Sequence, residues 1–426
     1  MTAEICIMNT SGVALAADSA VTIGGVQKIY TSAEKLFQLS LHAPVGLMIY
    51  GNAQFLDIPW ETIVKTYRRS LKDSPFRTVQ EYGESFITFL KSSPQMFPKE
   101  LQKERIILLL YIWYLDLIEE VKVELDLEAE KHGGLNVENV TKVVEKVITS
   151  NLDQVKKRDL LTGFDKRHIT RLKKALGSRV NEIKSQLFGT LPLNTASQKA
   201  LNSLTYEIIV RNTFGPLHSG VVIAGFGEEQ FMPAMINYTL EEMILDLPRV
   251  VKTRESLISS VNSSSVTPFA QKDMVYAFME GIQLDLWDFI QESTQNLFTG
   301  TIEIIINEIS KVDAQIGKHI KSKLDKNLEK MLQDLFDEWG KSKQRYWSPV
   351  LEVIAALPKD QLGEMAESFV NLTKFRRQIT AVPETVGGPI DVAVITKGDG
   401  FIWKKRKHYF DPTLNPRAIA RFQKGE

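Results

Sequence analysis

The 426-residue sequence contains a single cysteine, Cys6, and no excess of charge of either sign. One cysteine excludes an internal disulfide framework and a cysteine-rich metal site, and it fits a reducing cytosol. The 52 basic and 52 acidic side chains cancel, which argues against general affinity for nucleic acid or for an anionic membrane. The six histidines show no close ligand spacing, so we expect no metal.

Long hydrophobic segments are also lacking. The one long apolar run, residues 106–118, has 13 residues and is interrupted by Asp116, whereas a membrane-spanning helix needs ~20. A buried helix, in a core or a subunit interface, explains the run best; a surface that gathers unfolded substrates is the alternative. No secretory leader precedes Thr2, so we expect a cytoplasmic protein that matures by the removal of Met1 alone.

The start of the chain carries a potentially reactive pair of groups. Once Met1 is removed, Thr2 has a hydroxyl and a free α-amine in one residue, at the beginning of an apolar strand. A hydroxyl becomes a good nucleophile only when a base takes its proton, and an α-amine that titrates at ~7.7–8.0 can do this near neutral pH. Many chains begin Met-Thr with no catalytic role, so this pair needs support from other residues.

The residues that follow supply this support. Two apolar runs, 5–8 and 13–17, flank the turn sequence Asn9-Thr10-Ser11-Gly12, which is typical of a hairpin. Because the strands of a hairpin are antiparallel, the end of the second lies near the start of the first, which places Asp18 close to Thr2.

Two further strands contribute one residue each. Lys35 stands at the entrance of the first of them, and a buried lysine between Asp18 and Thr2 would stay charged and lower the pKa of the hydroxyl or amine beside it. The other, over residues 45–50, stops at Gly51, where a glycine lets the backbone N–H approach a developing oxyanion.

These motifs resemble a proteasome β-type subunit of the N-terminal-nucleophile hydrolases. The residues that carry the resemblance are Thr2, Gly12-Val13-Ala14-Leu15-Ala16-Ala17-Asp18, Lys35-Leu36-Phe37-Gln38-Leu39, Gly51-Asn52-Ala53-Gln54 and, far along the chain, Gly387-Gly388-Pro389-Ile390-Asp391-Val392-Ala393-Val394-Ile395-Thr396 with Asp399-Gly400-Phe401. The last two segments resemble the final hairpin of that fold. The resemblance implies an α+β fold, a four-layer αββα sandwich of two antiparallel sheets between helical layers.

Length is the main departure from the family. A β-type domain needs roughly 200 residues, and the remainder is mostly helical in character. We divide the chain into a first part of the core (1–94), a helical insertion (95–213), a middle part of the core (214–283), a second helical insertion (284–357) and a last helix with the final hairpin (358–426). Within the first part of the core we expect a helix that runs from Ala53 to about Leu71.

The resemblance also implies roles for individual residues. Thr2 Oγ1 would attack the scissile carbonyl and form an acyl-enzyme, while its α-amine takes the proton directly or through a water. Lys35 would tune Thr2, and Asp18 would fix Lys35. The Gly51 N–H would be the oxyanion donor, and Thr22 with Gly51 would hold the substrate backbone as an extended strand.

Two supporting positions fit the family less well. The family has a serine in a Gly-Ser-Gly turn just before a helix; Ser265 is the best candidate here, although its glycine neighbours are missing. The family also has an acid and a serine shortly before the final Gly-Gly. This chain has Pro383-Glu384-Thr385-Val386, so valine replaces the serine and the acid is at best shifted to Glu384.

We interpret the chain as a threonine-type peptide hydrolase that needs no cofactor, with Val21, Ala33 and Tyr50 as candidates for the lining of its substrate pocket. The family implies a peptide or unfolded protein as substrate, a homo-oligomer such as a ring, and an ATP-dependent unfoldase as a candidate partner. Two alternatives stay open. One is a non-proteolytic amidase or acyl-transfer enzyme that acts on a small amide, and the other is a catalytically silent scaffold subunit of the same fold.

Overall fold

The computed structural model describes residues 2–23, 28–71, 75–380, 386–417 and 419–420. The chain forms two compact units. The first comprises residues 1–36, 231–233 and 257–418, and the second comprises residues 37–230, 234–256 and 419–426.

The first unit is built on a five-stranded antiparallel sheet with the strand order β12-β1-β2-β13-β14. Its strands are β1 (Ala3–Asn9), β2 (Gly12–Ala17), β12 (Ser264–Ala270), β13 (Asp391–Thr396) and β14 (Gly400–Lys405). The hairpin turn between β1 and β2 is held by Asn9, whose side chain accepts hydrogen bonds from the N–H groups of Ser11 and Gly12. A short ribbon of β3 (Val21–Ile23) and β4 (Lys28–Tyr30) follows β2.

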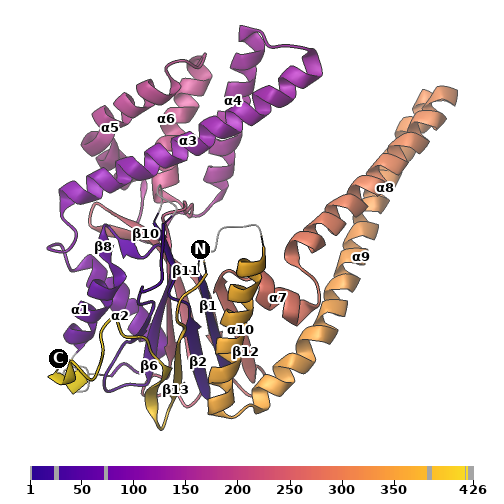
Figure 1. The fold of residues 1–426 in the computed structure, drawn as a ribbon. Coiled ribbons are helices and arrows are strands. Elements are labelled where there is room, and N and C mark those ends of the chain that lie inside the picture. Colours follow the sequence, from indigo (N-terminus) through magenta and orange to yellow (C-terminus); the bar gives the residue numbers. More distant parts are fainter. Residues whose placement is uncertain (1, 24–27, 72–74, 381–385, 418, 421–426) are drawn as a thin grey trace. The chain divides into compact units, whose positions relative to one another are not determined.

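The named helices in the described part of this unit are α7 (Asp273–Glu280), α8 (Leu284–Val312), α9 (Ala314–Ala356) and α10 (Lys359–Ile379). Helix α10 covers β1, β2 and β13 (Figure 1). Its Leu362, Ala366 and Phe369 pack in one apolar cluster with Ala3 and Ile5 of β1. Since side chains alternate along a strand, Thr2 and Glu4 point to the opposite face of the sheet.

Helices α8 and α9 lie side by side as a long hairpin (Figure 1). Asp313 caps α9 at the turn by accepting hydrogen bonds from two backbone N–H groups. At the base of the hairpin, Lys343 of α9 forms an ion pair of 2.7 Å with Glu280 of α7, and Ile354 is buried against the sheet.

The second unit contains the other five-stranded sheet, with the order β11-β10-β9-β6-β5. Its strands are β5 (Leu36–Gln38), β6 (Val45–Gly51), β9 (Ser219–Gly225), β10 (Ala234–Ile244) and β11 (Leu247–Leu257). Helices α1 (Trp60–Leu71) and α2 (Val79–Lys91) share an apolar core with this sheet, in which Trp60, Tyr82 and Phe86 are buried together with Val221 and Ile236.

Four more helices, α3 (Lys99–His132), α4 (Val137–Lys157), α5 (Lys166–Phe188) and α6 (Thr195–Val210), follow in the same unit and share an apolar cluster of their own. None of the helices in the described ranges is both long and apolar enough to cross a bilayer. The α+β class with two antiparallel sheets and helical layers, predicted from the sequence, is confirmed.

The helix expected from Ala53 is shorter than predicted. Residues 54–59 form a small ribbon of β7 (Gln54–Phe55) and β8 (Ile58–Pro59), and α1 begins only at Trp60. The turn of this ribbon places Leu56 and Asp57 in the left-handed region, with φ of 47° and 58°. It does so without a glycine, so the sequence gives no turn signal here.

Candidate active site

Thr2 is buried at the start of the first sheet, next to β1. Its carbonyl accepts a hydrogen bond from the Gln271 N–H at 3.2 Å, just past the end of β12. On the other side of β1, the Asp18 N–H donates to the Ala3 carbonyl at 3.1 Å. The hairpin thus brings Asp18 to the same end of the sheet as Thr2.

Three buried charged groups and the Thr2 hydroxyl form a continuous cluster, which we call the Thr2 cluster (Thr2, Glu4, Asp18 and Lys35). Lys35 Nζ lies 2.5 Å from Asp18 Oδ1 and 3.4 Å from Glu4 Oε1, and the two carboxylate side chains are 0 % exposed. Thr2 Oγ1 donates a hydrogen bond of 3.0 Å to Glu4 Oε2. Glu4 therefore bridges the hydroxyl and the lysine.

Backbone donors fix the Asp18 carboxylate. Oδ1 accepts from the Ala3 N–H at 3.1 Å, and Oδ2 accepts from the N–H groups of Ala20 at 3.2 Å and Gly387 at 2.8 Å. Gly387 belongs to the Gly-Gly motif before the final hairpin, so that motif contributes to the cluster through its backbone. Its neighbour Gly388 has φ of +76°, and an added Cβ would lie 2.7 Å from a side-chain atom of Thr31, so only glycine fits there.

Burial raises the pKa of Glu4 to about 8, from an ordinary value of 4.5. The positive charge of Lys35 opposes this shift, the negative charge of Asp18 adds to it, and the hydrogen bond from Thr2 opposes it. Glu4 Oε1 is buried without a well-aligned hydrogen bond, and Lys35 Nζ is its charge partner. The cluster therefore holds a buried carboxyl group that keeps its proton to higher pH than an exposed one does.

Sequence reasoning missed Glu4, although a signal was present. An acid two residues after Thr2 shares its face of the strand, because the side-chain period of a strand is two. The apolar run of the first strand begins at Ile5, and Glu4 lies just outside it, so the apolar pattern alone does not single out this acid.

Ser265 lies away from the cluster. The register pairs Ser265 with Met8, whereas Ala270 pairs with Ala3, so about six residues of strand separate Ser265 from Thr2. The position beside Thr2, just before α7, is taken by Gln271, a buried residue that the sequence did not single out.

Two of the other predicted residues, Gly51 and Tyr50, belong to the second unit. Gly51 ends β6 in the second unit with φ of +82°, and an added Cβ would lie 2.6 Å from the His218 carbonyl oxygen. Tyr50, in the same unit, accepts a hydrogen bond of 2.9 Å from Asn237. The oxyanion role of Gly51 and the pocket role of Tyr50 stay predictions.

Three candidates belong to the first unit. Val21 and Thr22 lie in β3, and the Ala33 N–H donates to the Ser19 carbonyl at 3.2 Å, which ties the segment before Lys35 to the residue after Asp18. Glu384 is outside the described residues. The substrate-binding roles of Val21, Thr22 and Ala33 stay predictions as well.

Ala270, which pairs with Ala3 next to Thr2, has a strained backbone conformation. It has φ of 55°, a conformation that costs an L-residue about 1–2 kcal/mol and a glycine almost nothing. Since glycine adds about 0.5–1 kcal/mol of backbone entropy cost, we expect Ala270→Gly to raise the free energy of unfolding by about 0.5–1 kcal/mol in a urea titration. Ala16→Gly, in the extended strand β2, is the control and should lower it. A loss of stability in Ala270→Gly as large as in the control would contradict the prediction.

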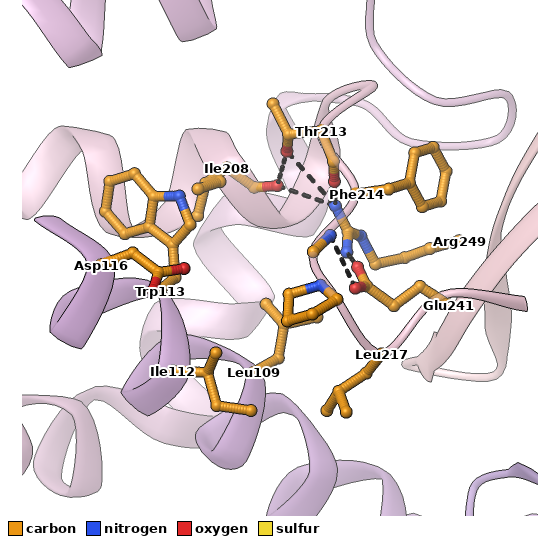
Figure 2. Close-up of a pocket in the computed structure, with 12 residues that line it drawn as sticks. Leu109, Ile112, Trp113, Asp116, Ile208, Thr213, Phe214, Leu217, Glu241 and Arg249 are labelled. Carbon is orange, nitrogen blue, oxygen red and sulfur yellow. Dashed lines mark hydrogen bonds and ion pairs between the residues drawn. The ribbon is translucent and has the colours of Figure 1, made fainter. Parts of the chain in front are cut away.

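A cavity with a volume of about 60 Å³ lies in the second unit. Figure 2 shows Arg249 between Glu241 and the segment around Thr213. Arg249 donates to the carboxylate of Glu241 and to the carbonyl of Thr213, and Glu241 also accepts from the Gly215 N–H at 2.8 Å. Further acceptors of the guanidinium are the carbonyls of Ile208 and Ile209. These polar groups satisfy one another, so the cavity is better explained as part of the scaffold than as a reaction site.

No protein-family model matches the chain, and no curated protein sequence matches it. Solved structures of Anbu proteins are similar to it. The Anbu (Gly-1) mutant from Hyphomicrobium sp. strain MC1 is 8 % identical with a TM-score of 0.30, and the alignment covers 100 % of this chain and 96 % of that one. Anbu in a helical assembly of the complex from Pseudomonas aeruginosa is 9 % identical with a TM-score of 0.29, covering 99 % and 94 % of the two chains.

Anbu (ancestral beta-subunit) from Yersinia bercovieri is 10 % identical, with a TM-score of 0.29 and coverage of 99 % and 92 %. Similarity at this level carries no argument about activity. The residues of the Thr2 cluster, rather than this similarity, indicate the function.

Proposed function

We propose that the protein is an N-terminal threonine hydrolase that cleaves amide bonds through an acyl-enzyme on Thr2. The observation that carries the proposal is the buried Thr2 hydroxyl, hydrogen-bonded at 3.0 Å to a carboxyl group that is itself paired with Lys35. Burying two carboxylates and a lysine at one end of a strand costs several kcal/mol of desolvation, and apolar residues of similar size would fill the space at lower cost. Buried charge clusters beside a nucleophile are concentrated at functional sites.

The chemistry follows from these contacts. Thr2 Oγ1 attacks the carbonyl carbon of the substrate, the amine leaves, and water then hydrolyses the ester on Thr2. Lys35 supplies a fixed positive charge beside the reacting groups, and Asp18 holds Lys35 through an ion pair of 2.5 Å. The Gly51 N–H is our candidate for the oxyanion donor. None of these steps needs a cofactor.

The resemblance of the motifs supports a peptide or unfolded protein as the substrate and a cytoplasmic location. It also supports a homo-oligomer. The helical assembly is described for the Pseudomonas aeruginosa protein, and we extend only the idea of self-association to this chain. An ATP-dependent unfoldase is the partner that such a peptidase would require for folded substrates.

Intact mass spectrometry with an epoxyketone tests the proposal, because this electrophile reacts with a hydroxyl and an adjacent α-amine. We expect the purified chain to lack Met1 and to gain one adduct, and we expect Thr2→Ala to gain none. Thr10→Ala, in the exposed turn after β1, is the matched control and should label as the wild type does.

The outcomes separate the alternatives. Retained Met1, or the absence of a Thr2-dependent adduct, would contradict the proposal and favour the scaffold. Adduct formation without hydrolysis of any peptide would favour the amidase that acts on a small amide.

A further inference from the structure

Among the residues that the structure describes, Glu4 is the one that accepts the hydrogen bond of the Thr2 hydroxyl. The two residues share one face of the strand, and Thr2 Oγ1 donates to Glu4 Oε2 at 3.0 Å. Lys35 Nζ lies next to Asp18 and Glu4, and the hydrogen bond of the hydroxyl runs to the carboxyl group. A general base must lie within about 2.6–3.2 Å of the atom whose proton it removes, and Glu4 meets this condition.

The surroundings of Glu4 prepare it for proton exchange. The charged groups that act on it are Lys35 and Asp18, and Phe269 and Ala17 are its neighbours across the two adjoining strands. Helices α7, α9 and α10 pack on the opposite face of the sheet. Burial makes the protonated form stable, and Lys35 keeps the ionised form accessible.

We propose that Glu4, rather than the α-amine, is the base that takes the proton from Thr2 Oγ1 and later returns it. This inference rests on the proposed function, because it concerns the same nucleophile. It makes Glu4 a catalytic residue, with Lys35 as the cation that stabilises its charged form.

The same carboxyl group accepts and returns the proton in each half of the reaction. As the bond between Thr2 Oγ1 and the substrate carbonyl carbon forms, the hydroxyl proton moves to Glu4 Oε2. When the carbon–nitrogen bond breaks, Glu4 gives this proton to the leaving amine. In the second half, water attacks the ester, its proton moves to Glu4, and Glu4 then protonates Thr2 Oγ1 as the acid product leaves.

A β-lactone tests this step, because its adduct is an ester on the hydroxyl alone and contains no bond to the α-amine, so its rate reports on removal of the hydroxyl proton. In the full chain we expect Glu4→Gln to acylate about 10²–10⁴-fold more slowly than the wild type, since glutamine keeps an acceptor near Thr2 but cannot take a proton. The wild-type rate should rise with pH as Glu4 loses its proton, and Glu4→Gln should lose this rise. Glu242→Gln removes another buried carboxyl group with a raised pKa, in the second unit, and should acylate at the wild-type rate.

Temperature gives a second readout that needs no variant. The ionisation of a carboxyl group absorbs little heat, whereas the ionisation of an amine absorbs much. The midpoint of the wild-type pH–rate curve should therefore stay nearly constant between about 10 and 40 °C. This range lies below the temperatures at which most mesophile domains unfold. This measurement decides the matter if Glu4→Gln does not fold.

The failures are distinguishable. If the wild type forms no Thr2 adduct at all, the proposed function fails. If the wild type labels and Glu4→Gln labels at the same rate with the same pH dependence, or if the midpoint falls steeply on heating, Thr2 remains the nucleophile and Glu4 is not its base.

Discussion

Replacing Lys35 with methionine should lower the free energy of unfolding by about 3–5 kcal/mol at pH 9. Methionine has a similar length but no charge, so it leaves the buried carboxylate of Asp18 without its partner at 2.5 Å. Glu4 loses its nearest cation as well. Removal of one member of a buried ion pair is costly because the remaining charge is cut off from water.

The effect should depend on pH in a defined direction. Burial raises the pKa of Glu4 to about 8, so the folded chain holds this proton more tightly than the unfolded chain does. The stability that Glu4 contributes is complete below its ordinary pKa of 4.5 and is lost as the pH rises through about 8. Lys35 opposes the upward shift, so without it the loss continues to higher pH. The decrease in the free energy of unfolding caused by Lys35→Met should therefore be larger at pH 9 than at pH 6.

Urea titrations of both chains at the two pH values measure this difference. Lys341→Met is the matched control, because Lys341 is 71 % exposed and its ion pair with Glu338 is a surface contact. Such pairs contribute about 0–1 kcal/mol, independent of the cluster. A deficit below about 1 kcal/mol at pH 9, or an equal deficit at both pH values, would contradict the cluster as described.

Replacing Arg249 with methionine should also cost about 3–5 kcal/mol. The change leaves the carboxylate of Glu241, which is 1 % exposed, without its cation, and it leaves the carbonyl of Thr213 without a donor. The double variant Glu241→Gln/Arg249→Met removes both charges, so it should recover part of this loss.

Thermal or urea unfolding of the single and double variants measures the coupling. Lys252→Met, on the same strand and 45 % exposed, serves as the control with an expected change of about 0–1 kcal/mol. A single variant within about 1 kcal/mol of the wild type, or a double variant less stable than Arg249→Met alone, would show that the pair does not support the scaffold in this way.

Local pattern was enough to predict the β1–β2 hairpin and the position of Asp18. The turn residues Asn9 to Gly12 and the apolar runs around them define the register, and the register sets which residue ends up beside the start of the chain. The position of Lys35 came from the resemblance and from its place at the entrance of a strand. Its ion pair with Asp18 is observed, whereas the catalytic roles of both residues stay predictions.

The register between strands that are distant in the sequence could not be predicted from local patterns. The sequence predicts Ser265 beside Thr2, but β12 pairs with β1 in a register that brings Ala270 and Gln271 there instead. Neither the left-handed conformation of Ala270 nor the buried pair of Glu241 and Arg249 has a local signature. Ala270 lies where β12 meets β1, and Arg249, eight residues from Glu241, also donates to the carbonyls of Ile208 and Thr213. Contacts of this kind are not encoded in composition or periodicity.

The hairpin of α8 and α9 leaves and re-enters the first unit at nearly one point, since Lys343 meets Glu280 at its base. With 29 residues, α8 extends roughly 43 Å from that point. Whole turns can therefore be added to or deleted from both helices together. The hairpin then becomes longer or shorter, while β1 and the groups around Thr2 keep their positions. Natural variation and protein engineering can thus adjust the reach of this arm independently of the chemistry at Thr2.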